Sequence, residues 1–323
     1  MLIEVKEATI VAKIKFGLQH PCFTHDGAGN EIFETVKERA LYAEAHGFDG
    51  FYVMDHFFQI PYVGALEEPM LESWTTISGL TQVTKKINLA TLVTGNIYRN
   101  PALLAKMAAN VDLMSNGRLI LGIGAGWFET EANAFDIPYY TISERGKRLD
   151  EALQVIRGMW MHPKGFSFQG KYYNIKNALC LPETIQKPHP PIMVGGSGEK
   201  QTLRLVAKYA DACNLFGGPK IIKTKLAVLK NHCIAVARDY DEILKSSLAS
   251  VVIGATEHEV SSLMSKLRSQ SLTDELYGTP KQIVAKIQER VDAGLQYQIV
   301  NFKGSNEKNS LRLFAEEVVP HFQ

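Results

Sequence analysis

Strand-like and helix-like segments alternate along nearly the whole chain of 323 residues. Eight short apolar segments typical of buried strands are each followed by an amphipathic helix pattern or, once, by a loop and then a helix. The predicted strands are 14–19, 48–55, 86–94, 118–124, 191–196, 211–216, 245–254 and 295–302. Eight such units close into a (β/α)8 barrel, which commonly needs about 250 residues and tolerates insertions. We therefore predict a single α/β domain, a TIM barrel, over residues 1–323.

The alternation is interrupted once, between residues 161 and 190. FSFQGKYYNI predicts a small hairpin and LPETIQKPHPP a proline-rich return, so we interpret this stretch as an insertion after the fourth strand that lies over the active site. An open, doubly wound sheet divided into two domains is the alternative fold. No linker, low-complexity tract or shift in charge marks a domain boundary, which favours one barrel.

Composition argues against several classes of function. The chain has 35 basic and 34 acidic residues, so it lacks the charge of a nucleic-acid-binding protein. No apolar segment approaches the roughly 20 residues needed to span a bilayer. Residues 1–17 lack a signal-peptide core, so we expect a cytoplasmic protein with no membrane partner. The four cysteines have no paired spacing, which indicates reduced thiols and neither a disulfide framework nor a zinc site.

Polar residues at the carboxyl ends of the strands are the candidates for chemistry, because barrel enzymes place their active sites there. The second strand ends in Asp55, and His56 follows it. An imidazole that titrates near neutrality beside a carboxylate can donate or accept a proton, so we predict that both residues are catalytic. In the structural alternative, Asp55 caps the following turn and His56 only packs.

Two further strand ends carry groups of interest. Arg99 follows the third strand and is compatible with anion binding and, equally, with an ion pair to an acid of the first helix. Besides Asp55 and His56, only His20 offers a metal ligand at a strand end. Three such groups are too few for a convincing cluster, so we predict no metal site.

Three glycines leave the end of the predicted fourth strand with few side chains. They occur in RLILGIGAGW as Gly122, Gly124 and Gly126. Bare backbone at a strand end lets a flat or phosphorylated ligand approach closely, although the spacing is not the dinucleotide fingerprint. A tight turn packed under a helix is the alternative interpretation.

A second glycine-rich segment follows the fifth strand. It consists of Gly195, Gly196, Ser197 and Gly198 and leads directly into the predicted helix EKQTLRLVAKYA. Free N–H groups at a helix start, next to glycines and a hydroxyl, predict a phosphate site. A helix cap with a flexible turn is the alternative.

Several motifs occur together in one order and spacing. They are MDHF, INLATLVTGNIYRNPALLAKMAANVDLMSNGRLILGIGAGW, ERGKRLDEALQVIRGMW and HPPIMVGGSGEKQTLRLVAKYADACNLFG. From Lys15 to about Phe302 the chain resembles the bacterial luciferase-like monooxygenase superfamily, and it is most similar to the branch of F420-dependent oxidoreductases. The resemblance implies a (β/α)8 barrel that binds FMN or the deazaflavin F420 at its carboxyl-end mouth and pairs as a homodimer through its early helices.

The resemblance also assigns cofactor contacts. It implies a non-prolyl cis peptide bond between Leu92 and Val93, in a bulge that supports the cofactor ring. The implied ring contacts are Asp55, His56, Thr94 and the loop from Gly122 to Gly126. The implied phosphate contacts are Gly195, Gly196, Ser197 and Gly198.

Two positions depart from the sugar-phosphate dehydrogenases of this superfamily. Those enzymes carry a tryptophan after the D-H-F motif and a glutamate, the proton donor, after the glycines of the fourth strand. This chain has Ile60 and Trp127 at these places, which argues against a sugar-phosphate substrate. Glu129 and Glu131 would supply a carboxylate only if their loop folded back over the ring, and a solvated loop face is the favoured interpretation.

The choice of cofactor depends on a compositional argument. The chain has 24 lysines and 11 arginines, which suggests an AT-rich genome, whereas many bacteria that use F420 are GC-rich and favour arginine. We therefore expect reduced FMN, a flavin reductase as its supplier, and monooxygenase chemistry on a small organic substrate. F420-dependent hydride transfer is the alternative. A non-catalytic flavin-binding protein is a third hypothesis, against which the presence of His56 argues.

Overall fold

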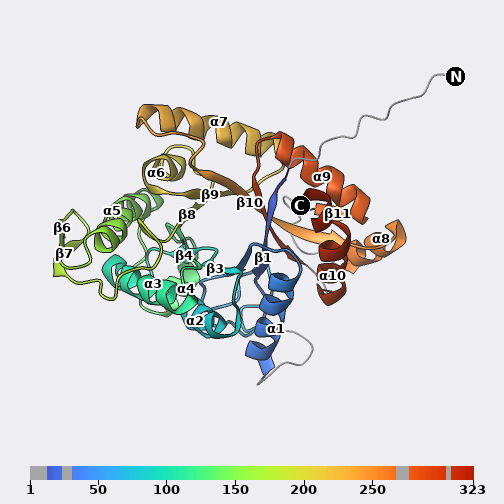
Figure 1. Ribbon diagram of the computed structural model, residues 1–323, viewed down its shortest axis with the longest axis horizontal. Coiled ribbons are helices and arrows are strands. Elements are labelled where there is room, and N and C mark those ends of the chain that lie inside the picture. The colour runs from blue at the N-terminus through green and yellow to red at the C-terminus, as the bar shows by residue number, and fades with distance from the viewer. Residues whose placement is uncertain (1–12, 24–30, 267–275, 303–306) are drawn as a thin grey trace.

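A closed parallel barrel lies at the centre of the molecule, with helices around it (Figure 1). The computed structural model describes residues 13–23, 31–266, 276–302 and 307–323. Around the barrel the strands follow in the order β1 (Lys15–His20), β2 (Gly50–Val53), β3 (Asn88–Thr91), β5 (Leu119–Gly124), β8 (Ile192–Gly195), β9 (Ala212–Leu215), β10 (Leu244–Ile253) and β12 (Tyr297–Phe302). Parallel pairing of β12 with β1 closes the ring. The predicted eight-stranded barrel is thus confirmed.

Helices connect the strands and form the outer layer (Figure 1). They are α1 (Ile32–Ala45), α2 (Ser73–Val83), α3 (Pro101–Ser115), α4 (Glu129–Ala134), α5 (Ile142–Met161), α6 (Thr202–Tyr209), α7 (Pro219–Ala235), α8 (Glu257–Lys266), α9 (Pro280–Asp292) and α10 (Glu307–Glu317). Proline stands at the start of α3, α7 and α9, where its missing N–H removes no helical hydrogen bond. Short strands β4 (Thr94–Gly95) and β11 (Leu276–Gly278) pair with β5 and β10.

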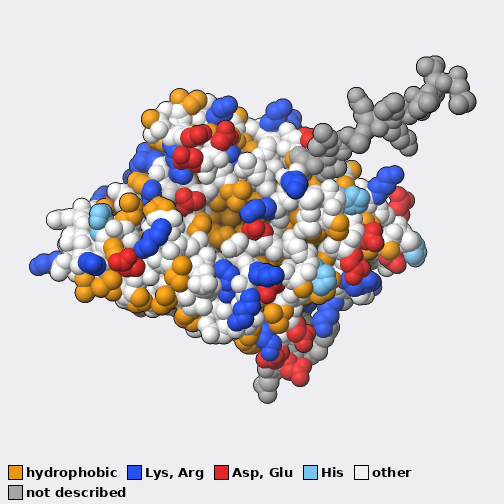
Figure 2. Space-filling model, viewed as in Figure 1, with side chains coloured by type: hydrophobic (Ala, Val, Ile, Leu, Met, Phe, Trp, Pro, Cys, Tyr) orange, Lys and Arg blue, Asp and Glu red, His pale blue; other side chains and the backbone are white. Residues whose placement is uncertain are grey.

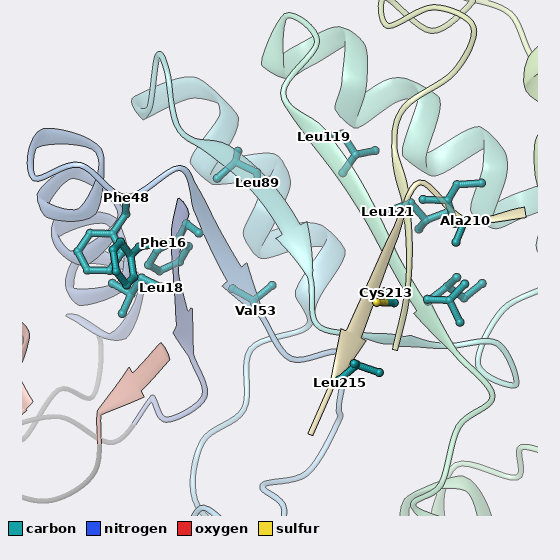
Figure 3. Packing of buried hydrophobic residues seen from close by; sticks show 14 of the residues in the cluster. Phe16, Leu18, Phe48, Val53, Leu89, Leu119, Leu121, Ala210, Cys213 and Leu215 are labelled. Carbon is teal, nitrogen blue, oxygen red and sulfur yellow. The ribbon is translucent and has the colours of Figure 1, made fainter. Parts of the chain in front are cut away.

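The main hydrophobic core fills the space between the barrel and the helices. Figure 3 shows part of this core, including Phe16 and Leu18 of β1 and Leu119 and Leu121 of β5. Alternate residues of each strand face outward into this layer, and the residues between them face the barrel interior. The strands are therefore buried on both sides, which explains why their sequences read as continuous apolar segments.

Two tyrosines dominate the smaller core inside the barrel. Tyr52 and Tyr297 are almost fully buried there, with ring centroids 6.2 Å apart. Glycines on β1 and β2 make room for them, because a Cβ atom at Gly17 would lie 2.5 Å from Cε2 of Tyr52, and one at Gly50 would lie 2.8 Å from the Tyr297 oxygen. Large side chains on two strands thus require small ones beside them.

The insertion forms the predicted hairpin, with strands β6 (Phe166–Gln169) and β7 (Asn174–Ala178) pairing antiparallel. Figure 1 shows it at the edge of the molecule, beside α5. Glu151 of α5 accepts hydrogen bonds from the N–H groups of Lys171, Tyr172 and Tyr173 at 2.8, 2.8 and 3.1 Å. These bonds hold the turn of the hairpin against α5, which determines where the insertion can reach.

Acidic and basic side chains are interspersed over the face drawn in Figure 2, and hydrophobic side chains gather at its centre, where the barrel strands lie in Figure 1. None of the four cysteines, all of which lie in the described residues, forms a disulfide, and Cys180, Cys213 and Cys233 are buried. Within the described residues, no helix is both long enough and apolar enough to cross a membrane.

The tight packing around Gly17 can be tested directly. We expect Gly17→Ala to lower the free energy of unfolding by about 1–3 kcal/mol, because the added methyl group overlaps the buried rings of Tyr52 and Tyr297. Thermal unfolding monitored by circular dichroism measures the change. Gly218→Ala is the matched control, since nothing lies within 4 Å of its added Cβ. Equal midpoints for the two variants would contradict the argument.

Candidate active site

A cavity of about 1800 Å³ opens at the carboxyl ends of the barrel strands. Its lining includes the segments that follow β2, β3, β5 and β8, the four strand ends that carry the predicted site residues. No residue from 161 to 190 lines it. The expected position of the insertion over the active site stays a prediction. Glu151 holds the hairpin against α5, and the Tyr173 hydroxyl accepts a hydrogen bond at 3.2 Å from Asn96, which follows the cavity-lining Gly95.

His56 lines this cavity and is held from behind by Glu131 of α4. The Nδ1 atom of His56 lies 2.9 Å from a carboxylate oxygen of Glu131, and the Glu131 side chain is fully buried. Since Nδ1 is engaged with Glu131, Nε2 is the ring nitrogen that remains for a ligand. A buried carboxylate on Nδ1 fixes both the tautomer and the orientation of the imidazole.

Glu131 also accepts three other hydrogen bonds. They come from the hydroxyl of Tyr98 and from the N–H groups of Phe57 and Phe58, the last at 3.0 Å. Burial alone would raise the pKa of the Glu131 carboxyl, but its hydrogen bonds with His56, Tyr98 and the Phe58 N–H lower it below the usual value. Burial and the neighbouring carboxylate raise the pKa of Tyr98, so its hydroxyl stays protonated and keeps donating.

This arrangement corrects the expectation for the loop after β5. Glu129 is exposed, as expected, but Glu131 is fully buried because α4 folds back against the segment after β2. The sequence gives little signal of this, because α4 has six residues and is too short for a reliable helical pattern. Glu131 accepts its hydrogen bonds from protein groups, positions the ring of His56 and is not among the residues that line the cavity.

Asp55 takes a different position from His56. Its side chain is fully buried, and it is not among the residues that line the cavity. It accepts hydrogen bonds from Thr94, from Ser73 at 2.7 Å, and from both terminal nitrogens of Arg99 at 2.6 and 3.1 Å. The carboxylate thus joins the end of β2 to the segment after β3 and the start of α2.

The ion pairs of Arg99 differ from both predicted alternatives, which were anion binding and an ion pair to an acid of the first helix. Besides Asp55, Arg99 pairs with Glu72, 2.6 Å away, and Glu72 is the N-cap residue of α2. Burial alone would lower the pKa of Arg99, but the carboxylates of Asp55 and Glu72 raise it above its usual value, so the guanidinium remains a cation. A bidentate guanidinium between two carboxylates is committed to the protein, which leaves it unavailable as an anion-binding group.

The peptide bond between Leu92 and Val93 is cis, as the family resemblance implies, and both residues line the cavity. The side chain of Val93 lies against two glycines, because a Cβ atom at Gly124 or Gly195 would come within 2.9 or 2.8 Å of its methyl carbons. At Gly122 an added Cβ would lie 1.9 Å from the carbonyl oxygen of Thr91. Gly122 is thus required by the packing against the β3 segment and is not among the residues that line the cavity, whereas Gly124 both packs against Val93 and lines the cavity.

Gly126 and Thr94 complete the glycine side of the site. Gly126 lines the cavity with a φ of +80°, a conformation that favours glycine. Thr94 lies in β4, where its hydroxyl donates to Asp55, and it is buried away from the cavity lining. The predicted ring contacts therefore divide into a group at the cavity surface and a supporting group beneath it.

The segment from Gly195 to Gly198 lines the cavity, but its hydrogen bonding differs from the simple prediction. The N–H of Gly196 donates to the carbonyl of Asn214 at 3.1 Å, so it is not free for a phosphate. Ser197 and Gly198 make no backbone N–H hydrogen bond within the described residues. Helix α6 begins at Thr202 and not directly after Gly198, because a turn over residues 199–201 intervenes.

Comparison with known proteins identifies the family. Residues 14–276 match the family model described as luciferase-like monooxygenase. The chain belongs to this family. It is therefore a luciferase-like oxidoreductase with the barrel that the family shares. In the described part of the chain, no group of three or more His, Cys, Asp or Glu residues is arranged to hold a metal ion.

Relatives of this luciferase-like chain use different cofactors. The chain is 26% identical over 319 residues to an F420-dependent glucose-6-phosphate dehydrogenase of Amycolatopsis mediterranei, with 88% of this chain and 92% of the relative covered. It is 25% identical over 287 residues to an FMNH2-dependent dimethylsulfone monooxygenase of Pseudomonas putida, with 77% and 78% covered. A long-chain alkane monooxygenase structure superposes with a TM-score of 0.83 at 18% identity, covering 96% of this chain and 91% of the other, which supports the fold alone.

The charge of Glu131 makes a testable contribution to the stability of this family member. Since its pKa is lower in the folded protein than the value of about 4.3 in an unfolded chain, its contribution is present above that value and is lost as the pH falls through the folded-state pKa. We expect Glu131→Gln to lower the free energy of unfolding by about 2 kcal/mol at pH 7. The difference between the unfolding free energies of the variant and the wild type should become smaller between about pH 5 and 3. Urea unfolding across this range measures both.

Glu129→Gln is the matched control for this measurement, because Glu129 is exposed on the same helix. Its unfolding free energy should follow that of the wild type at every pH. A Glu131→Gln deficit that stayed constant down to pH 3 would show that the ionised carboxylate is not what stabilises the site.

Proposed function

We propose that this chain is a flavin-dependent monooxygenase in which His56 handles a proton beside reduced FMN, acting on a small organic substrate. The pair formed by His56 and Glu131 at the cavity wall is the observation that carries the proposal. A buried carboxylate orients the His56 imidazole, which lies at the surface of the cavity near Gly124 and Gly126 and has Nε2 left for a ligand. This imidazole is suited to general acid and base catalysis.

The residues at the strand ends fit a ring-bearing phosphoester. One part of the cavity wall is formed by small residues and leaves room for a flat ring to lie against it. These residues are Val93, Gly124, Ala125 and Gly126. Ser197 and Gly198 offer backbone N–H groups for a phosphate, and the glycine has no side chain to obstruct it. When bound, reduced FMN supplies the electrons for the reaction with oxygen, and a flavin reductase is the proposed source of the reduced form.

The contribution of the protein is then to place the substrate and to control one proton. Glu131 stabilises the positive charge on His56 when Nε2 is protonated, so His56 can give that proton to a substrate oxygen and take it back from water. Asp55, beneath the cavity surface, acts as a positioning residue that fixes Thr94 and Arg99. General acid–base catalysis of this kind contributes about 10²–10⁴-fold to a rate.

F420-dependent hydride transfer is the second candidate function. The F420-dependent relative from Amycolatopsis mediterranei covers 88% of this chain, and this match favours it. Against it stand the excess of lysine over arginine and Trp127 at the position of the expected proton-donating glutamate. FMN therefore remains the preferred cofactor, and a direct binding comparison decides between the two.

Parallel titration of the purified protein with FMN and F420, each reduced under anaerobic conditions, tests the choice of cofactor. We expect the dissociation constant for reduced FMN to be at least about tenfold lower, which corresponds to about 1.4 kcal/mol. Both dissociation constants are obtained from the quenching of the tryptophan fluorescence of the protein. A preference for F420 of that size would overturn the monooxygenase proposal and support hydride transfer.

Substitution of His56 separates catalysis from binding. We expect His56→Gln to reduce turnover of any substrate that the wild-type protein accepts by about 10²-fold or more, with the cofactor dissociation constant changed by less than about threefold. His258→Gln, at an exposed position of α8, is the matched control. Equal losses of turnover and cofactor affinity in His56→Gln would assign His56 a structural role.

A further inference from the structure

We infer that the part of the cavity beside His56 binds an uncharged, apolar substrate that lies against Trp127 and Tyr62. This inference names the substrate class for the proposed function and rests on it. It draws on three observations: the distribution of charge around the cavity, an exposed aromatic pair within it, and the volume available.

Charge is distributed unequally around the cavity wall. The lining residues within 54–63, 92–98 and 124–127 include His56 but no Asp, Glu, Lys or Arg. The charged lining residues are Arg39, Glu68, Arg145, Glu199, Lys200, Lys225, Glu307 and Lys308. Glu199 and Lys200 directly follow the segment from Gly195 to Gly198, whereas Glu68 follows the 54–63 segment. The Arg145 guanidinium lies 4.2 Å over the ring of Tyr139, whose hydroxyl donates to the Trp127 carbonyl. The wall formed by the segments 54–63, 92–98 and 124–127, here called the uncharged side, contains the imidazole, and the residues after Gly198 form a charged side suited to a phosphate.

An aromatic pair lies on the uncharged side. The ring centroids of Tyr62 and Trp127 are 5.9 Å apart, and Trp127 lies 5.6 Å from the ring of His56. Phe128 stacks against Trp127 at 5.1 Å and is buried, so it supports the indole from behind. Tyr62 and Trp127 remain 62% and 46% exposed although they line a cavity. Large apolar surface left exposed in a concave site marks a ligand-binding surface.

The chemistry of this wall selects against ions. A phosphate or carboxylate placed between Trp127, Tyr62 and Ile60 would lose water and gain no cationic partner from these segments, which costs several kcal/mol. Aromatic or alicyclic rings instead gain from burial and from stacking on the indole. The glucose-6-phosphate of the Amycolatopsis relative therefore does not fit this side, whereas an uncharged ring with one oxygen directed at His56 does.

The volume of the cavity allows both molecules to bind together. Its 1800 Å³ exceeds the range of about 300–1,000 Å³ typical of sites for a single small ligand. With the cofactor phosphate on the charged side and its ring over Val93 and Gly124, the wall of Tyr62 and Trp127 remains for the substrate.

Trp127 itself provides the test. The chain has three tryptophans, and the other two, Trp74 and Trp160, are 1% and 3% exposed, so the long-wavelength emission of the protein comes from Trp127. Benzyl alcohol and benzoate share a ring and differ in charge. We expect benzyl alcohol to shift this emission to shorter wavelength with a saturable, roughly millimolar dissociation constant. Benzoate and glucose 6-phosphate should produce no such shift at the same concentrations.

Substitutions make the test specific. Tyr62→Ser should weaken benzyl alcohol binding about threefold to tenfold, whereas Tyr277→Ser, at a half-exposed tyrosine of β11 outside the cavity, should leave it unchanged. Trp127→Phe should remove the spectral response. The inference is overturned by the absence of a saturable shift, by an equal shift with benzoate, or by equal affinities of the two tyrosine variants.

FMN binding is measured on the same samples, so that the two proposals fail separately. Loss of the benzyl alcohol response with FMN binding intact contradicts the apolar site alone. A clear benzyl alcohol response in a protein that does not bind FMN contradicts the proposed cofactor and leaves the apolar site in place.

Discussion

One buried carboxylate connects the two loops that form the cavity wall. Glu131 accepts hydrogen bonds from His56, Tyr98 and the N–H groups of Phe57 and Phe58, so a single side chain of α4 fixes the segments after β2 and β3. Each hydrogen bond to a charged group of this kind contributes about 1.5–3 kcal/mol, and an unpaired buried carboxylate would be costly. The orientation of His56, and with it the proton chemistry of the site, depends on this carboxylate being ionised and fully bonded.

A second buried carboxylate performs a similar task one position earlier in the chain. Asp55 joins Ser73, Thr94 and Arg99, which lie on different elements, and Arg99 extends the connection to Glu72 at the start of α2. Adjacent residues of one strand end therefore point to opposite environments. Asp55 is buried and holds together the segments beneath the cavity, whereas His56 lines the cavity. Two neighbouring residues therefore have different roles, one in positioning and one at the surface that a ligand can reach.

Local pattern was sufficient to predict the barrel, its eight strands and the hairpin, because burial on both faces gives each strand a continuous apolar sequence. Among the predicted site glycines, Gly124 and Gly126 and those at 195–198 line the cavity, whereas Gly122 packs against Thr91, and family resemblance located the cis bond at Leu92. The partners of the polar groups were not predictable. Glu131 lies 75 residues from His56, and Arg99 lies 44 from Asp55, and no short-range periodicity encodes a contact over such separations. The same limitation applies to the position of the hairpin, which depends on its contact with Glu151, itself 20 residues away from Lys171.

The attachment of the hairpin to α5 has a consequence for how a protein of this kind diverges. Glu151 binds the N–H groups of Lys171, Tyr172 and Tyr173, and no hairpin residue lines the cavity. The hairpin reaches the segment after β4 through the Tyr173 hydroxyl, which accepts a hydrogen bond from Asn96 at 3.2 Å. If Tyr62 and Trp127 contact the substrate as we propose, selection for a new substrate acts on the short connections that carry them. Evolutionary variation at 166–178 that preserves Tyr173 can therefore accumulate without changing the residues that line the cavity.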